Sequence, residues 1–241
     1  MKIAFATGNK GKLREAQEIL GSDFQIITPA DLGMTGDIEE NGTSLMANSL
    51  IKAKYIYDNY SVDSLADDSG LEVEILGGEP GIYSARYAGP EHDFQANMDK
   101  LLSEMARMMK EASRAREYGI NTVHATYRAR FRTVVTLIIG GQTTFFEGQL
   151  DGRIGLVKKG TNGFGYDPIF IPDMIPAEAA APLPEGSAFS LEPDADGLVK
   201  NIGMVTLAQL SEDQKNAISH RGKAMRKMAA FLLEGKSDSK E

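Results

Sequence analysis

The pair Asp67-Asp68 carries the clearest chemical signal in the sequence, because two adjacent carboxylates follow a short apolar run and precede Ser69-Gly70. A strand that ends in a Ser-Gly turn would direct such carboxylates away from the core. Hard cations such as Mg²⁺ take oxygen ligands and often need only one or two carboxylates when a phosphate supplies the rest. The pair therefore predicts a magnesium site that activates water, and the alternative is a capped turn with solvated acids.

A loop of small and basic residues, Thr-Gly-Asn-Lys-Gly-Lys at 7–12, connects a predicted strand to a predicted helix. Backbone N–H groups in such a loop, and at the helix N-terminus that follows it, attract phosphate. The glycine spacing does not match the Walker pattern, so an ordinary P-loop is excluded. The loop predicts phosphate binding of another kind, and the alternative is a plain turn between strand and helix.

Glu40 and Lys52 could complete such a site. Glu40 lies just before a predicted helix, and Ser44, Asn48 and Lys52 recur every four residues along it, which places them in one polar stripe. Taken singly, the acid is typical of a solvated turn and the lysine of a surface charge. Together with the acid pair and the first loop, they favour a site for a metal and a phosphate.

Two later segments have residues suited to a nucleotide base. Residues 164–168, Phe-Gly-Tyr-Asp-Pro, combine two aromatic rings with an acid fixed before a proline. Aromatic faces stack on bases, and an acid can accept a hydrogen bond from a base-edge N–H. Lys215 and the Ser-His-Arg triplet at 219–221 add cations that suit phosphates or carbonyl oxygens. The alternatives are aromatic rings in the core and cations on the surface.

The elements that must position these residues alternate between strands and helices. Strands are predicted at 3–6, 24–28, 64–66, 71–76, 125–139 and 143–147, and helices at 13–20, 44–59, 94–109 and around 224–232. Gly140-Gly141 predicts a long hairpin, and Ser211 with Gln214 predicts a capping box. Alternating helices and strands with a hairpin indicate an α/β class with a mixed sheet.

We predict a single domain over residues 1–235 with two insertions. The stretch 107–123 is charged and loses its periodicity, and the stretch 175–203 is rich in Pro, Ala, Glu and Gly and is predicted to be a loop. Residues 236–241 are predicted to be a disordered tail.

Composition excludes several classes of protein. The 241 residues contain no cysteine, so disulfides, thiolate zinc sites and a cysteine nucleophile are excluded. A net charge of −8 disfavours binding to long nucleic acid, although a free nucleotide needs only a few cations. No apolar run approaches a membrane span, and the first residues have too short an apolar stretch for a signal peptide. We therefore expect a cytoplasmic protein.

Motifs spread over nearly the whole chain resemble those of the non-canonical purine nucleoside triphosphate pyrophosphatases, also called inosine triphosphate pyrophosphatases (ITPases). The segments that carry the resemblance are TGNKGK at 7–12, EENGTSLMANSLIKAK at 39–54, ADDSGLEV at 66–73, PGIYSARYAG at 80–89, GTNGFGYDPIF at 160–170 and EDQKNAISHRGKA at 212–224. They follow the order of the family and are highly specific together. The chain departs from the family in the length of the two insertions and in Gln209, where the family has a glutamate.

The resemblance implies an elongated, two-lobed α/β fold, with a central mixed β-sheet flanked by helices and an active-site cleft between the lobes. It also implies a homodimer and a Mg²⁺-dependent hydrolase that converts ITP, dITP and XTP to the monophosphate and pyrophosphate, cleansing the nucleotide pool. Catalytic roles fall on Asp68 and Lys52, and metal ligation falls on Glu40 and Asp68, with the choice of base between Asp67 and Asp68 left open. Substrate binding falls on Thr7, Gly8, Asn9, Lys10, Gly11, Lys12, Ser69, Phe164, Gly165, Tyr166, Asp167, Lys215, His220 and Arg221.

Two other functions stay open. One is a related pyrophosphatase that prefers pyrimidine or modified nucleotides. The other is a non-catalytic nucleotide sensor, which the retained acids and Lys52 disfavour. A membrane or long nucleic acid is not expected as a partner.

Overall fold

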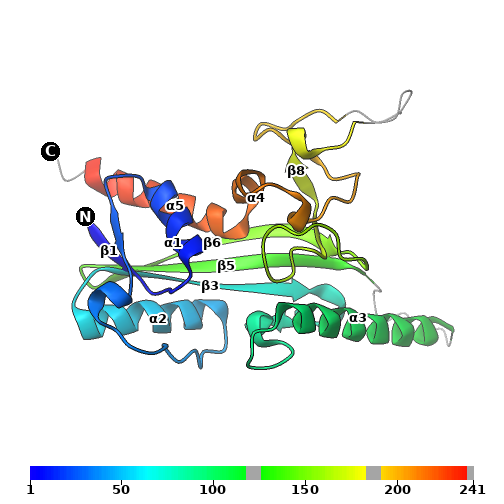
Figure 1. Cartoon of the computed structure of the whole chain (residues 1–241), viewed down its shortest axis with the longest axis horizontal. Coiled ribbons are helices and arrows are strands. Elements are labelled where there is room, and N and C mark those ends of the chain that lie inside the picture. The colour runs from blue at the N-terminus through cyan, green and yellow to red at the C-terminus, as the bar shows by residue number, and fades with distance from the viewer. Residues whose placement is uncertain (118–125, 183–190, 238–241) are drawn as a thin grey trace. The chain divides into compact units, whose positions relative to one another are not determined.

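The computed structural model describes residues 1–117, 126–182 and 191–237 (Figure 1). The chain divides into two compact units. Unit 1 comprises Met1–Ser69, Arg132–Gln149 and Ser219–Glu241, and unit 2 comprises Gly70–Phe131 and Leu150–Ile218. Within the described ranges, no helix has the length and apolar character that crossing a bilayer requires.

The predicted α/β class with a mixed sheet is confirmed. Among the described residues, seven strands form one sheet in the order β2-β1-β3-β5-β6-β7, with β4 paired to β3, and β8 and β9 form a separate pair. The strands are β1 (Lys2–Phe5), β2 (Gln25–Ile27), β3 (Ser64–Val73), β4 (Pro80–Gly81), β5 (Arg128–Ile139), β6 (Gln142–Ile154), β7 (Phe170–Pro172), β8 (Met174–Pro176) and β9 (Leu198–Lys200). Strand β1 runs parallel to β2 and β3, whereas β4 and β7 are antiparallel to their neighbours.

Five α-helices and five short 3₁₀ helices occur in the described ranges. The α-helices are α1 (Lys10–Leu20), α2 (Leu45–Tyr60), α3 (Phe94–Glu117), α4 (Glu212–Ile218) and α5 (His220–Ser237). The 3₁₀ helices are η1 (Ala30–Leu32), η2 (Glu74–Leu76), η3 (Ser84–Arg86), η4 (Ala177–Ala179) and η5 (Leu207–Gln209). The predicted capping box is confirmed, because Ser211 and Gln214 exchange side-chain-to-backbone hydrogen bonds at the start of α4.

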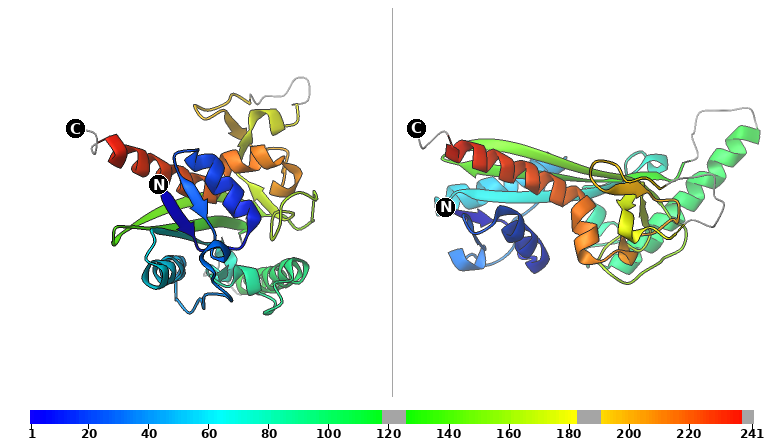
Figure 2. Two further views of the ribbon diagram at one scale, coloured as in Figure 1. Left: turned by 60° about the vertical axis from the view of Figure 1, so that its left-hand side comes forward. Right: turned by 90° about the horizontal axis from the view of Figure 1, so that it is seen from above.

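Unit 1 has helices on both faces of its strands (Figures 1 and 2). Successive side chains of a strand point to opposite faces. Ile3 and Phe5 of β1 accordingly join the apolar cluster formed with α1 and α5, whereas Ala4 and Ala6 join the cluster formed with α2. Helices α1 and α5 also contact one another. Strand β1 is therefore packed on both faces, which fixes the position at which the loop 7–12 begins.

Unit 2 has an apolar core of its own. Leu101 and Met105 of α3 pack there with Leu71 of β3 and Phe170 of β7, all with almost no exposed surface. The core also includes the ring of Tyr166.

Some of the predicted elements differ from the structure. Residues 64–66 and 71–76 do not form two strands around a turn, because β3 runs without interruption from Ser64 to Val73 and residues 74–76 form the 3₁₀ helix η2. The helix predicted at 94–109 continues to Glu117, and Arg107 pairs there with Glu104 and Glu111, which stabilises an exposed helical face.

The second predicted insertion is also not simply a loop, because its ends form the antiparallel pair β8–β9. Helix α5 includes residues 236 and 237 of the predicted tail. The rest of that tail, residues 118–123 of the first predicted insertion and residues 183–190 of the second lie outside the described residues.

Candidate active site

Two residues of the predicted polar stripe, Asn48 and Lys52 on α2, face the interior of unit 1, whereas Ser44, which caps the helix, is exposed. Asn48 is fully buried and Lys52 is only 9% exposed, whereas Met46 on the same helix is 39% exposed. A helix normally buries its apolar side, and a buried amide or ammonium is unfavourable unless a partner compensates it. The stripe therefore indicates a polar site beneath α2.

The partners of the stripe are the acids predicted from the sequence. Lys52 Nζ lies 3.1 Å from Glu40 Oε1 and 3.5 Å from Asp68 Oδ1. Asn48 Nδ2 donates a hydrogen bond to Asp68 Oδ2 at 3.1 Å. Glu40, Lys52 and Asp68, which are far apart in the sequence, are thus brought together around one ammonium group.

The pKa values of this group reflect burial and mutual charge. Burial is the largest influence on Asp68 and raises the pKa of its carboxyl; Lys52 opposes that rise and Glu40 adds to it, and the net pKa is raised. Burial alone would lower the pKa of Lys52, but the carboxylates of Asp68, Asp67 and Glu40 together outweigh it and raise that pKa. The Asp68 carboxylate therefore accepts a proton more readily than an ordinary aspartate, and Lys52 stays charged.

Asp67 has a different environment. It is 1% exposed, and its carboxylate lies 2.8 Å from Lys12 Nζ and 3.6 Å from Arg221 Nε. Burial raises the pKa of Asp67, but Lys12, Arg221 and Lys52 outweigh burial and hold it at about 2. Asp67 is thus a permanent anion that positions two cations.

The acids fit a magnesium ion in type and number. Glu40 and Asp68 both place a carboxylate oxygen near the Lys52 ammonium. The two carboxylates therefore lie around one cation already, which is the arrangement that a bound metal ion needs. No group of three or more His, Cys, Asp or Glu side chains suited to a metal occurs within the described ranges. Mg²⁺ commonly binds through one or two carboxylates and completes its shell with water and phosphate oxygens, which matches this pair.

The first loop forms the N-terminus of α1. Asn9 caps the helix, and its Oδ1 accepts hydrogen bonds from the N–H groups of Gly11 and Lys12 at 2.9 and 3.2 Å. Thr7 Oγ1 accepts the N–H of Asn9. Gly8 and Lys10 are exposed, and a side-chain carbon at Gly8 would meet no neighbour. The loop therefore offers an accessible helix N-terminus and the amine of Lys10.

The Ser-His-Arg triplet begins helix α5. Ser219 Oγ accepts the N–H of Gly222 at 2.9 Å, which caps the helix at His220. Arg221 pairs with Asp67 and, at 3.4 Å, with the buried carboxylate of Glu15 on α1. Glu15 was not predicted from the sequence, although its position one turn after Lys12 on the same helix is a weak signal.

The start of α5 is fixed by a close approach to β6. A side-chain carbon at Gly148 of β6 would lie 1.9 Å from the carbonyl oxygen of His220, so only glycine leaves room for the helix backbone.

Ser69, the last predicted residue of this group, forms a hydrogen bond with the buried Thr133, with 2.6 Å between the two hydroxyl oxygens. Unit 1 therefore holds every predicted residue of the first loop, the acids, Lys52, Ser69 and the triplet.

The residues predicted to contact a base form a second cluster within unit 2. The N–H of Phe164 donates to Asp167 Oδ2 at 2.8 Å, and Lys215 Nζ forms an ion pair with the same carboxylate oxygen. The Lys215 ammonium also lies 4.7 Å from the centre of the Phe164 ring, a cation–π contact. Phe164 is 47% exposed, so its ring can contact a ligand.

Tyr166 does not share this exposure. Its ring lies in the core of unit 2, its hydroxyl donates to the backbone oxygen of Ser84 at 2.9 Å, and burial raises the pKa of that hydroxyl. Gly165 has a left-handed φ of 63°, which lets the chain turn between the two rings. Phe94 was not predicted to belong to the site, but its ring centre lies 6.1 Å from that of Phe164.

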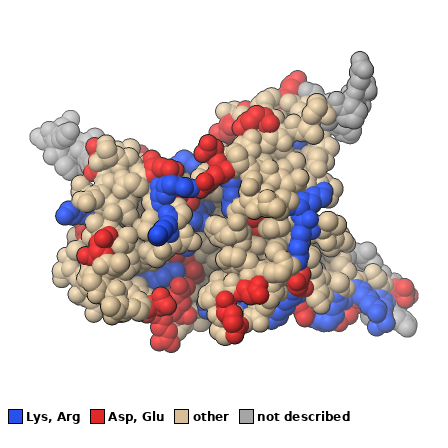
Figure 3. All heavy atoms as spheres, viewed as in Figure 1, with Lys and Arg blue, Asp and Glu red and all other residues tan. Residues whose placement is uncertain are grey.

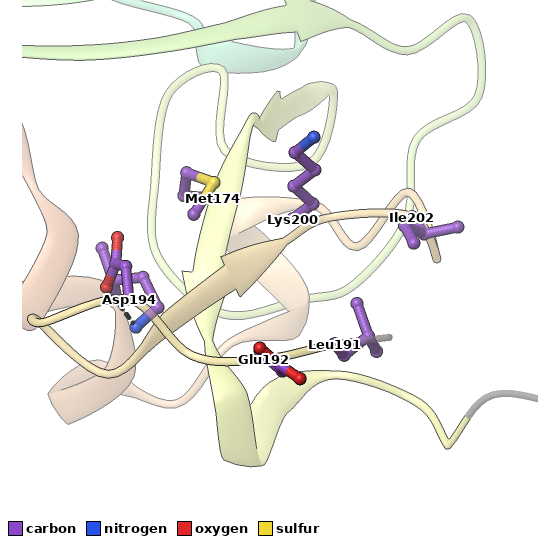
Figure 4. A pocket seen from close by; sticks show the side chains of 7 residues that line it. Met174, Leu191, Glu192, Asp194, Lys200 and Ile202 are labelled. Carbon is purple, nitrogen blue, oxygen red and sulfur yellow. Dashed lines mark hydrogen bonds between the residues drawn. The ribbon is translucent and has the colours of Figure 1, made fainter. Parts of the chain in front are cut away.

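Two further features of the surface are its charge distribution and a cavity in unit 2. On the face drawn in Figure 3, Lys and Arg side chains are interspersed with Asp and Glu. A cavity of about 380 Å³ occurs in unit 2 beside the β8–β9 pair, and Figure 4 shows its lining. The lining residues are Met174, Leu191, Glu192, Asp194, Leu198, Lys200 and Ile202. None of them was predicted to belong to the site.

The fold and the group of Glu40, Lys52 and Asp68 in unit 1 define an α/β protein whose partly buried acids and lysine suit a divalent cation and a phosphate. The chain belongs to the Ham1 family, whose model matches residues 3–188 and 198–231. This confirms the family resemblance seen in the motifs.

Relatives and solved structures agree with this assignment. A dITP/XTP pyrophosphatase from Christiangramia forsetii is 35% identical over 96% of this chain and 99% of its own length. The Bacillus subtilis protein of the same description is 36% identical over 94% of each chain. Among solved structures, the Staphylococcus aureus Ham1 protein has a TM-score of 0.72 and 34% identity, covering 98% of this chain and 100% of its own.

Proposed function

We propose that the chain hydrolyses non-canonical purine nucleoside triphosphates, dITP, XTP and ITP, to the monophosphate and pyrophosphate. The observation that carries this proposal is the partly buried group of Asp68, Glu40 and Lys52, in which Asn48 donates a hydrogen bond to Asp68. Full-length relatives described as dITP/XTP pyrophosphatases support the choice of reaction and substrate.

The proposed chemistry is mostly positioning and charge neutralisation, as is usual for phosphoryl transfer. Glu40 and Asp68 would hold Mg²⁺, which when bound neutralises phosphate oxygens and lowers the pKa of a ligand water. Lys12 and Lys52 stabilise the negative charge that develops on the departing pyrophosphate. Lys10 and the N-terminus of α1 bind phosphate oxygens.

Asp68 is the proposed general base. Its carboxylate accepts a proton from the attacking water while the water oxygen bonds to the α-phosphorus and the bond from that phosphorus to the bridging oxygen breaks. The raised pKa of Asp68 favours this role, because a carboxylate of higher pKa is a stronger base. Asp67, whose pKa is about 2, is a poor base and instead holds Lys12 and Arg221 in place.

The cluster in unit 2 is proposed to recognise the base. Inosine and xanthosine present a 6-oxo acceptor and an N1–H donor, whereas adenine presents a 6-amino donor and an N1 acceptor. Asp167 can accept the N1–H, Lys215 can donate to the 6-oxo group, and the exposed ring of Phe164 can stack on the base. Adenine would leave a donor or acceptor unpaired, which disfavours it by about 1–3 kcal/mol for each such group.

A nucleotide panel tests this proposal. Pyrophosphate release is measured with Mg²⁺ for ITP, dITP, XTP, ATP, GTP, CTP and UTP. We expect the 6-oxo purines without a 2-amino group to react much faster than ATP and the pyrimidines. Equal turnover of all seven would contradict the base assignment, release of single phosphate would contradict the reaction, and binding without turnover would identify a sensor.

The homodimer, the cytoplasmic location and the absence of long nucleic acid as a partner remain predictions. The homodimer rests on the family resemblance, and light scattering on the purified chain would measure it. The net charge of −8 and the mixed charges in Figure 3 support the third prediction.

A further inference from the structure

Asn48 connects the two segments that carry the proposed metal ligands. Its side chain is fully buried on α2. Nδ2 donates to Asp68 Oδ2 at 3.1 Å, and Oδ1 accepts the N–H of Gly42 at 2.9 Å. Gly42 follows Glu40 by two residues, so one side chain joins the strand that carries Asp68 to the loop that carries Glu40.

The chemistry of the two partners fixes the orientation of the amide. A carboxylate can only accept a hydrogen bond and a backbone N–H can only donate one, so Asn48 must turn Nδ2 to Asp68 and Oδ1 to Gly42. A carboxylate at position 48 would repel Asp68, and an apolar side chain would leave the partly buried N–H of Gly42 without this acceptor. An amide of this length satisfies both partners at once.

The absence of a side chain at Gly42 permits the contact with Asn48. A side-chain carbon there would lie 2.6 Å from Asn48 Oδ1 and 2.8 Å from the Cβ of Ala47, both closer than real contacts allow. The loop can therefore approach α2 closely enough to reach the amide only because residue 42 has no side chain. The approach brings Glu40 to within 3.1 Å of Lys52 Nζ.

We propose that Asn48 is a positioning residue of the metal site, which holds the carboxylates of Asp68 and Glu40 at the separation that a divalent cation requires. This inference rests on the proposed function, in which those two residues bind Mg²⁺. Partners that orient metal ligands typically change metal affinity 10–100-fold when they are removed. We expect the loss of Asn48 to act within that range.

The experiment measures metal binding directly, with Mn²⁺ in place of Mg²⁺ and electron paramagnetic resonance as the readout. Five full-length proteins are compared: the unaltered chain, Asn48→Ala, Gly42→Ala, Asp68→Asn and Ser49→Ala. Ser49 is the matched control because it is also fully buried on α2 and hydrogen-bonded, to Thr136 at 2.6 Å, but has no contact with Asp68 or Gly42 among its hydrogen bonds. Urea unfolding of each protein gives the accompanying stability.

Asn48→Ala is expected to raise the Mn²⁺ dissociation constant at least tenfold. Gly42→Ala pushes the loop away from Asn48 Oδ1 but keeps the amide that donates to Asp68, so it is expected to raise the constant less. Ser49→Ala should lose stability without a change in Mn²⁺ affinity. The inference is overturned if Asn48→Ala binds Mn²⁺ as the unaltered chain does, or if Ser49→Ala weakens binding equally. If Asn48→Ala does not fold, unchanged affinity in Gly42→Ala overturns it instead.

Asp68→Asn separates failure of this inference from failure of the proposed function. If Asp68→Asn loses Mn²⁺ and Asn48→Ala does not, only the role of Asn48 is wrong. If Asp68→Asn binds Mn²⁺ normally, or the unaltered chain binds none, the proposed metal site is wrong and the inference falls with it. A matching activity measurement should show Asn48→Ala needing about tenfold more Mg²⁺ for half-maximal pyrophosphate release.

Discussion

Replacing Asp67 by Asn tests the division of labour between the two adjacent acids. The change keeps the size of a side chain that is 1% exposed and removes the charge that faces Lys12 and Arg221. The pKa of Asp67 lies at about 2 against an ordinary 3.8, which corresponds to about 2–3 kcal/mol in favour of the folded anion. Breaking a buried ion pair from one side typically destabilises by about 3–5 kcal/mol.

We expect Asp67→Asn to lower the free energy of unfolding by about 2–4 kcal/mol. The side chain of Lys12 is 21% exposed, so water can compensate part of its loss and the effect falls below the full range for buried pairs. For a chain of this size the melting temperature should fall by about 4–16 °C. Asp68→Asn is the matched control, because burial and Glu40 already disfavour its charge, and its stability should change by less than about 1 kcal/mol.

We expect catalytic activity to rank the two variants in the opposite order from stability, with the larger loss in Asp68→Asn. Asp68→Asn should lower the turnover number for ITP at saturating Mg²⁺ by about 10²–10⁴-fold, because it removes the proposed base. Asp67→Asn should retain more activity than Asp68→Asn at a temperature where both are folded. Near-normal turnover in Asp68→Asn with none in Asp67→Asn would exchange the two roles. Equal stability of the two variants in urea would refute the argument from the ion pairs.

The same pair predicts a dependence of stability on pH. The folded pKa of Asp67 is lowered, so its stabilising contribution is present above the unfolded pKa near 4 and is lost as the pH falls from about 4 towards 2. Urea unfolding of the unaltered chain should lose about 2–3 kcal/mol more over that interval than Asp67→Asn does. Parallel curves for the two proteins would contradict the assigned pKa direction.

Three further outcomes are expected. Replacing residues 177–196 by a short Gly-Ser linker should leave a folded, active enzyme in circular dichroism and pyrophosphate assays, because the β8–β9 pair can be closed by a brief turn; lost activity with an intact fold would place the segment in the site. Gly148→Ala should destabilise by at least about 3 kcal/mol in urea, because its new carbon would overlap the backbone of α5, whereas Gly203→Ala should have little effect. Lys215→Ala should reduce the preference for ITP over ATP about tenfold in kcat/KM, and an unchanged ratio would exclude Lys215 from base recognition.

Local pattern was sufficient to predict most elements of the fold. The helix predicted at 13–20 is α1, which begins earlier than predicted, after the Asn9 cap, and ends at Leu20 before Gly21. The helix predicted at 44–59 is α2, which begins after the Ser44 cap. Local pattern did not predict the short strands β4, β7, β8 and β9. Strand β3 shows why local pattern fails. The letters Asp-Asp-Ser-Gly are typical of a turn, but the cations that stabilise Asp67 within a strand come from positions 12 and 221. Partners so distant in sequence are invisible to any local window.

The site was predictable in its residue types but not in its burial. The four-residue repeat that includes Asn48 and Lys52 indicated a polar stripe, and a polar stripe on a helix usually faces water. Here Asn48 and Lys52 are buried, because the acids of β3 and of the loop before α2 compensate them, and only Ser44 of the repeat is exposed. Tyr166 shows the converse, since an aromatic ring in a binding motif belongs to the core. The difference lies in tertiary contacts, which single-residue chemistry does not encode.

The continuity of β3 explains why adjacent acids can have unlike roles. Successive side chains of a strand point to opposite faces, so Leu65 and Asp67 share one face and Ala66 and Asp68 share the other. Leu65 packs in the cluster with α1 and α5, and Asp67 accordingly meets Lys12 and Arg221 from those two helices. Ala66 packs in the cluster with α2, and Asp68 meets Asn48 and Lys52 from that helix. A turn would have left both carboxylates in similar surroundings, whereas the strand gives one of them to a fixed ion-pair network and leaves the other, with its raised pKa, beside the lysine and the second acid.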